Sequence, residues 1–208
     1  MNDELTSRLF KRLTSQNWRQ HDTTADIIVQ MHKDGTTSKI NDDEWATFIL
    51  EIDLTPDVPE NVRNLFEVAQ GVLCYGSYFY PLYTLGHEQI FRVLESALRH
   101  KCVELGKPGR ADTFSRMLNW LREYGRLPDY HYVRWDAARK LRNMASHADR
   151  QSLVDPTWAV RTLSVAAELI NELFASMPKT MGAPNAAGWA KKEGAADTAP
   201  NVVSPLQA

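Results

Sequence analysis

A basic and a titratable side chain occur close together near the end of a predicted helix. Arg142 is followed by Asn143, and His147 comes five positions after Arg142. An arginine carries a permanent positive charge that can bind phosphate oxygens, and a histidine can exchange a proton near neutral pH. RNA supplies its own nucleophile in the 2′-hydroxyl group. These residue types therefore suit the cleavage of an RNA phosphodiester without a metal ion.

Each of the three residues has a defined role in such a reaction. His147 would act as general base or acid, because free imidazole has a pKa of about 6.5. Arg142 would stabilise the charge that develops on the phosphate, and Asn143 would orient His147 or hydrogen-bond the phosphate. On a regular helix, five residues turn Arg142 and His147 about 140° apart. The helix must therefore loosen near Ser146, or a second subunit must supply the partner.

Structural roles also fit these residues. His147 could interact with the last carbonyl groups of its helix. Arg142 could form a salt bridge with Asp136 or with an acid on another helix. Asn143 could be an ordinary polar residue at a helix end. The sequence leaves the catalytic and the structural interpretations open.

Charged residues on the preceding predicted helix recur at steps of four, three and four. Such a stripe is typical of a solvated face with salt bridges, and the alternative is that Glu88 or Glu95 faces a cleft and pairs with Arg142. The stripe comprises Glu88, Arg92, Glu95 and Arg99. The candidate RNA-contacting residues are Glu88, Arg92, Arg134, Arg139 and Lys140.

Aromatic residues gather in two places. The cluster Tyr75, Tyr78, Phe79, Tyr80 and Tyr83 could stack on bases, but helix packing or a dimer interface fits it better. The basic and aromatic run over residues 130–135 is a modest candidate for an RNA-contacting surface.

The charge is unevenly distributed along the 208 residues, although the formal net charge is only −2. Residues 1–61 contain six basic and twelve acidic residues, whereas residues 92–150 contain thirteen basic and seven acidic residues. The small net charge excludes a uniformly basic nucleic-acid-binding protein. The basic central segment suits an anionic ligand or contact with the acidic region, and scattered solvated charge is the alternative.

Neither a metal site nor a membrane segment is expected. Cys74 and Cys102 lie in apolar helical surroundings without a CxxC or Cys/His ligand pattern, and no His has ligand-spaced partners. No glycine-rich phosphate loop occurs, so no cofactor is expected. The most apolar run, residues 71–85, is short and contains Pro81. An acidic rather than basic start and free cysteines favour a cytoplasmic protein.

Almost every apolar segment repeats at helical spacing, which predicts an all-α fold. No strand with a hairpin turn is expected. Leu5, Leu9 and Leu13 mark a short first helix. Further helices are expected at about 23–33, 41–55, 60–79, 82–105, 113–121, 130–146 and 156–174. They predict an acidic N-terminal helical extension over 1–58, a bundle of four to five core helices over 59–177, and a disordered tail over 178–208.

The stretch from Leu141 to His147 resembles the motif of the HEPN superfamily, an arginine, commonly an asparagine, and a histidine after a short gap. Residues 135–140 and 87–99 resemble the helices that accompany this motif, so the similarity covers about residues 60–177. The resemblance implies a helical domain that cleaves or binds RNA. HEPN proteins are often ribonucleases of toxin–antitoxin, phage-defence and RNA-processing systems. They usually act as homodimers in which the arginine–histidine pairs of two subunits line one cleft.

Two hypotheses follow for this chain. The first is a metal-independent endoribonuclease of a bacterial stress or defence system, with Arg142, Asn143 and His147 at its site. Because many HEPN proteins are not catalytic, the second is a helical module that binds a protein, nucleotide or RNA partner. A cognate antitoxin or regulatory protein is an expected partner in either case. A less favoured third hypothesis is a helical regulator that uses its acidic N-terminal region as an interaction arm.

Overall fold

The computed structural model describes residues 10–27, 29–109, 113–145 and 153–175. Within these residues the regular structure is almost entirely helical, which confirms the predicted all-α fold. The main elements are α1 (Asp42–Leu50), α2 (Glu60–Cys74), α3 (Pro81–Glu104), α4 (Phe114–Glu123), α5 (Asp129–Ala145) and α6 (Pro156–Phe174). None of the helices described is both long and apolar enough to cross a membrane. The predicted C-terminal tail lies outside the described residues, as do Leu5 and Leu9.

Local signals set the start of three helices as predicted. Asn41 caps α1 in a capping box, in which its side chain accepts from the Glu44 amide and the Glu44 carboxylate accepts from the Asn41 amide. The Thr113 hydroxyl accepts from the amide of Arg116 at the start of α4. Asp155 caps α6, whose first residue is Pro156.

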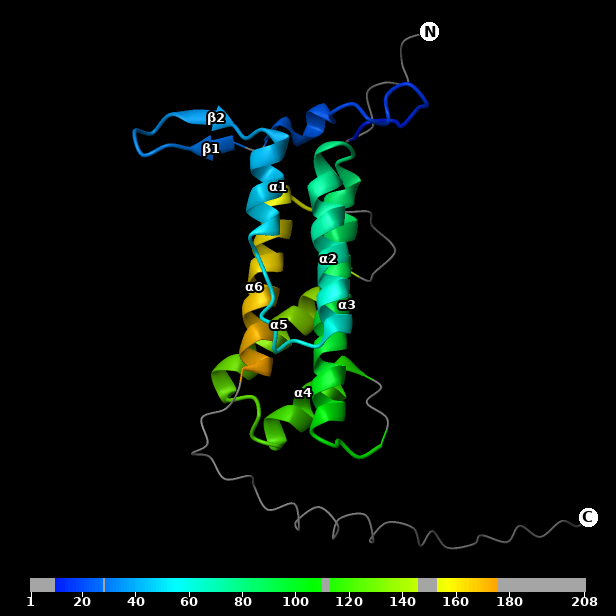
Figure 1. The fold of residues 1–208 in the computed structure, drawn as a ribbon, viewed down its shortest axis with the longest axis vertical. Coiled ribbons are helices and arrows are strands. Elements are labelled where there is room, and N and C mark those ends of the chain that lie inside the picture. Colours follow the sequence, from blue (N-terminus) through cyan, green and yellow to red (C-terminus); the bar gives the residue numbers. More distant parts are fainter. Residues whose placement is uncertain (1–9, 28, 110–112, 146–152, 176–208) are drawn as a thin grey trace, which may run out of the picture. The chain divides into compact units, whose positions relative to one another are not determined.

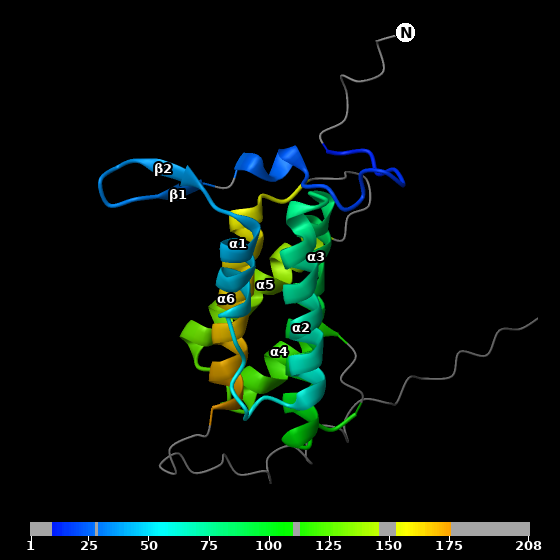
Figure 2. The ribbon, with the colours of Figure 1, turned by 45° about the horizontal axis from the view of Figure 1, so that its top comes forward.

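The long helix α3 lies at the centre of the bundle and packs against α2, α4, α5 and α6. In Figures 1 and 2, α2 and α3 run side by side and α6 lies beside them, and α1 packs against α2. Gly86 permits the close approach of α2 and α3, because a Cβ atom there would lie 2.5 Å from the Leu73 side chain. The largest fully buried side chains include Trp135, Tyr83, Phe66, Ile49, Leu73, Ile90 and Leu94.

Helix α1 shares this core although it precedes the prolines at 56 and 59. Trp45 and Ile49 are buried in the same apolar cluster as the other helices. The buried Gln70 amide of α2 donates to the carbonyls of Ile49 and Ile52 at the end of α1. Asn171 of α6 is hydrogen-bonded to the backbone of the connection between α1 and α2. The N-terminal region predicted as an extension thus supplies part of the core.

The helix predicted over residues 23–33 is wrong. Only a short 3₁₀ turn, η1 (Thr23–Ile27), forms, and it is followed by the hairpin strands β1 (Val29–Met31) and β2 (Thr37–Lys39). The Asp34 carboxylate accepts from the amide and hydroxyl of Thr36, and Gly35 has a φ of 84°. Asp-Gly is a strong hairpin signal because glycine adopts this conformation without strain. The expectation of no hairpin is therefore also wrong.

The helix predicted over residues 60–79 ends earlier, at Cys74, and continues as a 3₁₀ turn, η2 (Tyr75–Ser77). Gly76 allows the Tyr83 ring to pack closely against this turn, because a Cβ atom there would lie 2.4 Å from the ring. The buried Asp22 carboxylate accepts from the Tyr80 amide at the start of α3, and the Asp22 amide donates to the Ser77 carbonyl. The segment before the hairpin is thereby bound to the bundle.

Candidate functional site

Arg142 lies in the last turn of α5 and points to the middle of α3. Its Nη2 atom donates to Glu95 Oε2 at 3.3 Å. The Arg142 side chain is 43% exposed and that of Glu95 is 25% exposed. The structure thus contains the salt bridge to another helix that was one of the sequence-based alternatives. It leaves the guanidinium accessible at the surface.

Glu95 also contacts a second arginine of α3. Arg99 Nη2 lies 3.5 Å from Glu95 Oε1, the usual approach of side chains four residues apart on a helix. One carboxylate therefore lies between two guanidinium groups from different helices. Such an arrangement fixes the position of the cations and leaves an excess of positive charge among these three side chains.

The motif is only partly described. Asn143 is exposed at the end of α5, and His147 lies outside the described residues. After the gap, the Val154 amide donates to the Thr84 hydroxyl of α3 at 3.0 Å. The described residues on both sides of the gap are therefore bound to α3. Their anchors, Glu95 and Thr84, lie eleven residues apart on the helix, or about 16 Å.

Three of the candidate RNA-contacting cations are bound by carboxylates of the same chain. Arg134 of α5 contacts Glu168 at 2.6 Å and Glu172 at 3.2 Å, both on α6. Arg139 and Lys140 contact Asp136 at 2.8 and 3.0 Å. Hydrogen bonds from Arg139 and then Lys140 lower the pKa of the Asp136 carboxyl. The salt-bridged face was predicted for Glu88, Arg92, Glu95 and Arg99, and of these residues Glu95 and Arg99 form an ion pair.

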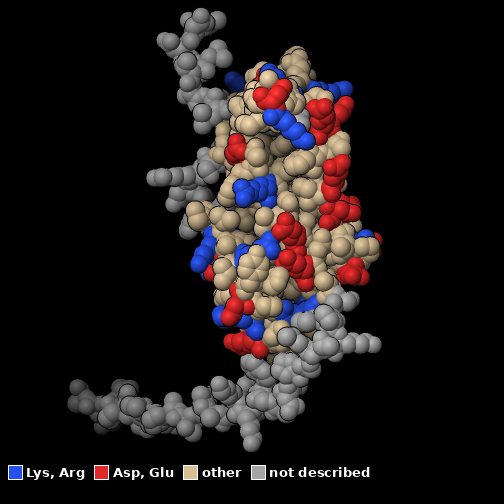
Figure 3. Space-filling view, turned by 90° about the vertical axis from the view of Figure 1, so that its left-hand side faces the viewer, with Lys and Arg blue, Asp and Glu red and all other residues tan. Residues whose placement is uncertain are grey.

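Within the part of the chain that the structure describes, neither of the remaining candidates, Glu88 and Arg92, forms an ion pair with Arg142. Glu88 and Arg92 are exposed on α3. In the face shown in Figure 3, acidic and basic side chains are interspersed and do not form one continuous basic surface. The basic and aromatic run over residues 130–135 does not form one exposed RNA-contacting surface either. Trp135 is buried, and His131 Nδ1 contacts Glu172 at 2.8 Å.

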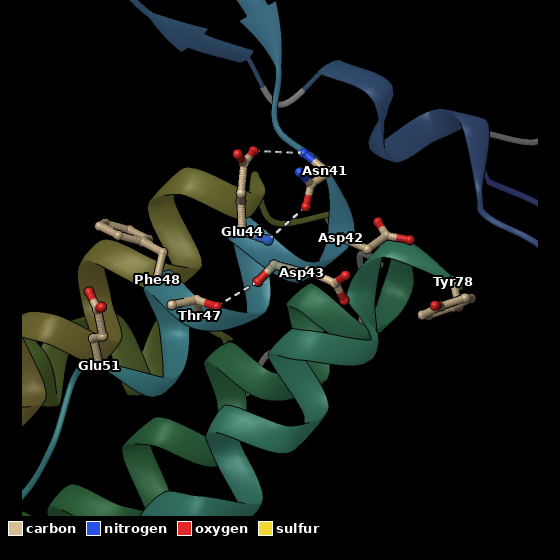
Figure 4. Close-up of a pocket in the computed structure, with 8 residues that line it drawn as sticks. All are labelled: Asn41, Asp42, Asp43, Glu44, Thr47, Phe48, Glu51 and Tyr78. Atoms are coloured by element: carbon tan, nitrogen blue, oxygen red, sulfur yellow. Dashed lines mark hydrogen bonds between the residues drawn. The ribbon is translucent and has the colours of Figure 1, made fainter.

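An acidic groove on α1 was not identified from the sequence. It has a volume of about 680 Å³ and opens widely to solvent (Figure 4). The helix dipole alone explains the acidic residues in the first turn of α1, so the sequence carries no signal for a groove. Among the residues that the structure describes, no cluster of three metal-ligating side chains occurs. The groove is lined by Asn41, Asp42, Asp43, Glu44, Thr47, Phe48, Glu51 and Tyr78.

Two of the groove carboxylates already have partners. The Glu44 carboxylate belongs to the capping box, and Asp42 Oδ1 lies 3.3 Å from His21 Nδ1. The other ring nitrogen of His21 lies 3.0 Å from Asp26, which also contacts Lys39 at 2.9 Å. These contacts connect η1, β2 and α1. The carboxylates of Glu44 and Asp42 therefore stabilise the local fold.

His87 is a buried histidine of α3 that the candidate site does not use. Neither ring nitrogen has a hydrogen-bond partner, and the ring makes an edge contact with Phe91. Burial lowers the pKa of His87 from its ordinary value of 6.5. The neutral imidazole therefore acts as part of the core, and protonation of this ring opposes folding.

Comparison with known proteins found no match to a family model, to a curated protein or to a solved structure.

Proposed function

We propose that this protein is a HEPN-like, metal-independent endoribonuclease that cleaves RNA through attack of the 2′-hydroxyl group. The observation that supports the proposal best is the position of Arg142 at the end of α5. Its guanidinium is held by Glu95 and is 43% exposed, so it is oriented and also accessible to a phosphate. A buried, fully enclosed arginine would instead support a purely structural role.

In the proposed reaction Arg142 binds the scissile phosphate and stabilises the additional negative charge of the transition state. His147 removes the proton of the 2′-hydroxyl group or protonates the leaving 5′ oxygen. Asn143, exposed beside Arg142, hydrogen-bonds the phosphate or orients His147. The products are a 2′,3′-cyclic phosphate and a 5′-hydroxyl end. The proposal includes a bacterial defence or stress role, a cytoplasmic location and an antitoxin or regulatory protein as partner.

A second function, a non-catalytic module that binds a partner protein, is favoured by a different observation. Arg134, Arg139 and Lys140 are all in ion pairs within the chain. An RNA-binding surface relies on basic side chains that replace the counterions of phosphates. Cations that are already paired contribute less to such binding.

Cleavage of end-labelled RNA in the presence of EDTA distinguishes the two functions. The nuclease predicts cleavage by the wild type that leaves a cyclic phosphate, and loss of this cleavage in His147→Ala and Arg142→Ala. Ser164→Ala, on α6, is the matched control and retains wild-type cleavage. Absence of cleavage over a panel of RNAs, with all proteins folded, would reject the nuclease and favour the binding module.

A further inference from the structure

A small cavity lies where the segment before α1 meets the helical bundle. It has a volume of about 20 Å³ and is bordered by residues of η1, β2, α1 and η2. Trp45 of α1 and Ser77 of η2 are its most deeply buried polar residues, with exposed fractions of 5% and 3%. We call this space the η2 cavity. Arg142 does not border it.

Two polar atoms at the η2 cavity have no hydrogen-bond partner among the residues that the structure describes. They are the Trp45 Nε1 atom, which can only donate, and the Ser77 Oγ atom, which can donate and accept. Buried polar atoms of folded proteins are almost always hydrogen-bonded, either to other protein groups or to ordered water. Two unpaired atoms of this kind beside one cavity therefore point to a ligand inside it.

A third group of the same kind belongs to Tyr83 of α3. Its hydroxyl is fully buried and likewise lacks a partner within the described part of the chain. The Tyr83 ring makes an edge contact with Trp45 at a centroid distance of 6.4 Å and packs against Gly76, the neighbour of Ser77. Burial raises the pKa of Tyr83, so the hydroxyl keeps its proton. Unpaired groups from α1, η2 and α3 thus lie close together.

The size of the η2 cavity limits its ligand. A space of about 10–15 Å³ accommodates one water molecule, provided that about two to four polar groups surround it. The volume of about 20 Å³ therefore admits one water molecule and nothing larger. Trp45 Nε1 and Ser77 Oγ supply two of the polar groups that a buried water molecule needs.

The charges at the rim of the cavity favour a neutral ligand over an ion. The carboxylates of Asp26 and Asp42 contact the His21 ring at 3.0 and 3.3 Å, and Asp26 also contacts Lys39 at 2.9 Å. An anion would meet the two carboxylates, whereas a cation would meet the lysine ammonium. The Trp45 N–H group cannot ligate a cation, because it is a donor only. A water molecule, which both donates and accepts, fits all of these groups.

We propose that the η2 cavity binds one structural water molecule, which accepts a hydrogen bond from Trp45 Nε1 and is hydrogen-bonded to Ser77 Oγ. The Tyr83 hydroxyl or a rim carboxylate provides its remaining partner. The Ser77 carbonyl already accepts from the Asp22 amide at 2.7 Å, so the water adds a second link at the same turn. The segment before α1 is thereby fastened to the bundle by a bound water molecule as well as by Asp22.

Nuclear magnetic resonance of the full chain tests the site. The indole N–H proton of Trp45, assigned with the help of Trp45→Phe, is expected to show a nuclear Overhauser effect to water with the sign of a bound molecule. Its chemical shift is expected to be the same at low and high sodium chloride concentrations. Absence of the Overhauser effect would overturn the proposal. A chemical shift that saturates with added salt would overturn it as well, because an ion would then occupy the cavity.

Oxygen-17 relaxation dispersion of the solvent separates a bound water molecule from exchanging hydroxyl protons, because it detects only long-lived water oxygens. Ser77→Val removes one partner and fills the cavity, so this variant should hold one long-lived water molecule fewer than the wild type. Ser164→Val, at a half-buried position of α6 that does not border the cavity, is the matched control and should keep the wild-type number. Should Ser77→Val not fold, Trp45→Phe, which removes the donor, takes its place with the same expected loss. An equal number in the folded variant and the control would overturn the proposal.

Discussion

The side chains of Glu95 on α3 and Arg142 on α5 are in contact at 3.3 Å, although 47 positions separate them in the sequence. The contact ties the end of α5 to the middle of the central helix. Because both side chains remain partly exposed, its contribution to stability is small, of the order of 0–1 kcal/mol. Its main effect is to orient the guanidinium.

Replacement of Glu95 tests this orienting effect. Under the proposed nuclease function, Glu95→Gln is expected to lower kcat for RNA cleavage about tenfold with little change in KM, because small misplacements of a catalytic group are costly. The unfolding free energy should change by less than about 1 kcal/mol. Glu67→Gln, at an exposed position of α2, is the control. Unchanged kcat in Glu95→Gln would show that Arg142 needs no orientation by this carboxylate.

A pair of glycines tests the packing of α2 on α3. Gly86→Ala should destabilise the fold by about 1–3 kcal/mol, because its new methyl group would overlap the Leu73 side chain. Gly71→Ala, where a Cβ atom meets nothing within 4 Å, should stabilise α2 by about 0.5–1 kcal/mol. Urea unfolding of both variants measures the two effects. Similar stabilities of the two variants would contradict the close helix approach.

The buried Asp22 carboxylate provides a third test. It accepts from the Tyr80 amide at 2.9 Å and from the Thr24 amide at 3.1 Å. Asp22→Ala leaves these donors without partners and should cost about 1–3 kcal/mol. Hydrogen exchange at the Tyr80 amide should accelerate in the variant. Asp34→Ala, in the exposed hairpin turn, serves as the comparison and should leave exchange at Tyr80 as in the wild type.

His87 should make stability depend on pH below neutrality. Burial lowers its pKa in the folded state below the ordinary value of 6.5, so the unfolded chain binds the proton first as the pH falls. Stability is therefore greatest above pH 6.5 and decreases below it, by at most about 1.4 kcal/mol per pH unit from this group. His87→Leu should remove this part of the slope.

Urea unfolding of the wild type and of His87→Leu at several pH values between 5 and 8 measures the difference. His100→Leu, on the same helix, controls for the loss of a histidine. Parallel stability curves for the wild type and His87→Leu would contradict the expected effect.

Sequence reasoning succeeded where the determining interactions are local. Asn41, Thr113 and Asp155 each accept from a backbone amide within three residues, so their residue types were sufficient to place the helix starts. The hairpin was also encoded locally, by Asp34 and Gly35. It was missed because strands of three residues are too short to show alternation.

The candidate site depends on contacts that the sequence leaves undetermined. The spacing of Glu88 and Glu95 allowed either residue to pair with Arg142, and only the packing of α5 on α3 selects Glu95. In the same way, the sequence allows Arg134 to contact RNA, but in the structure its guanidinium is paired with Glu168 and Glu172 of α6. Contacts between helices distant in sequence decide which charges are paired.

The hydrogen bond between Asn171 and the Asp53 carbonyl spans 118 positions of the chain. Because of this hydrogen bond, the connection between α1 and α2 reaches its final structure only when the last helix, α6, has packed against it. Contacts of such high sequence separation slow folding, because a long loop must close before they form. During synthesis α1, α2 and α3 leave the ribosome well before α6, so the apolar surface that α6 covers stays open meanwhile. Folding of this bundle is therefore expected to be completed after translation of its final helix.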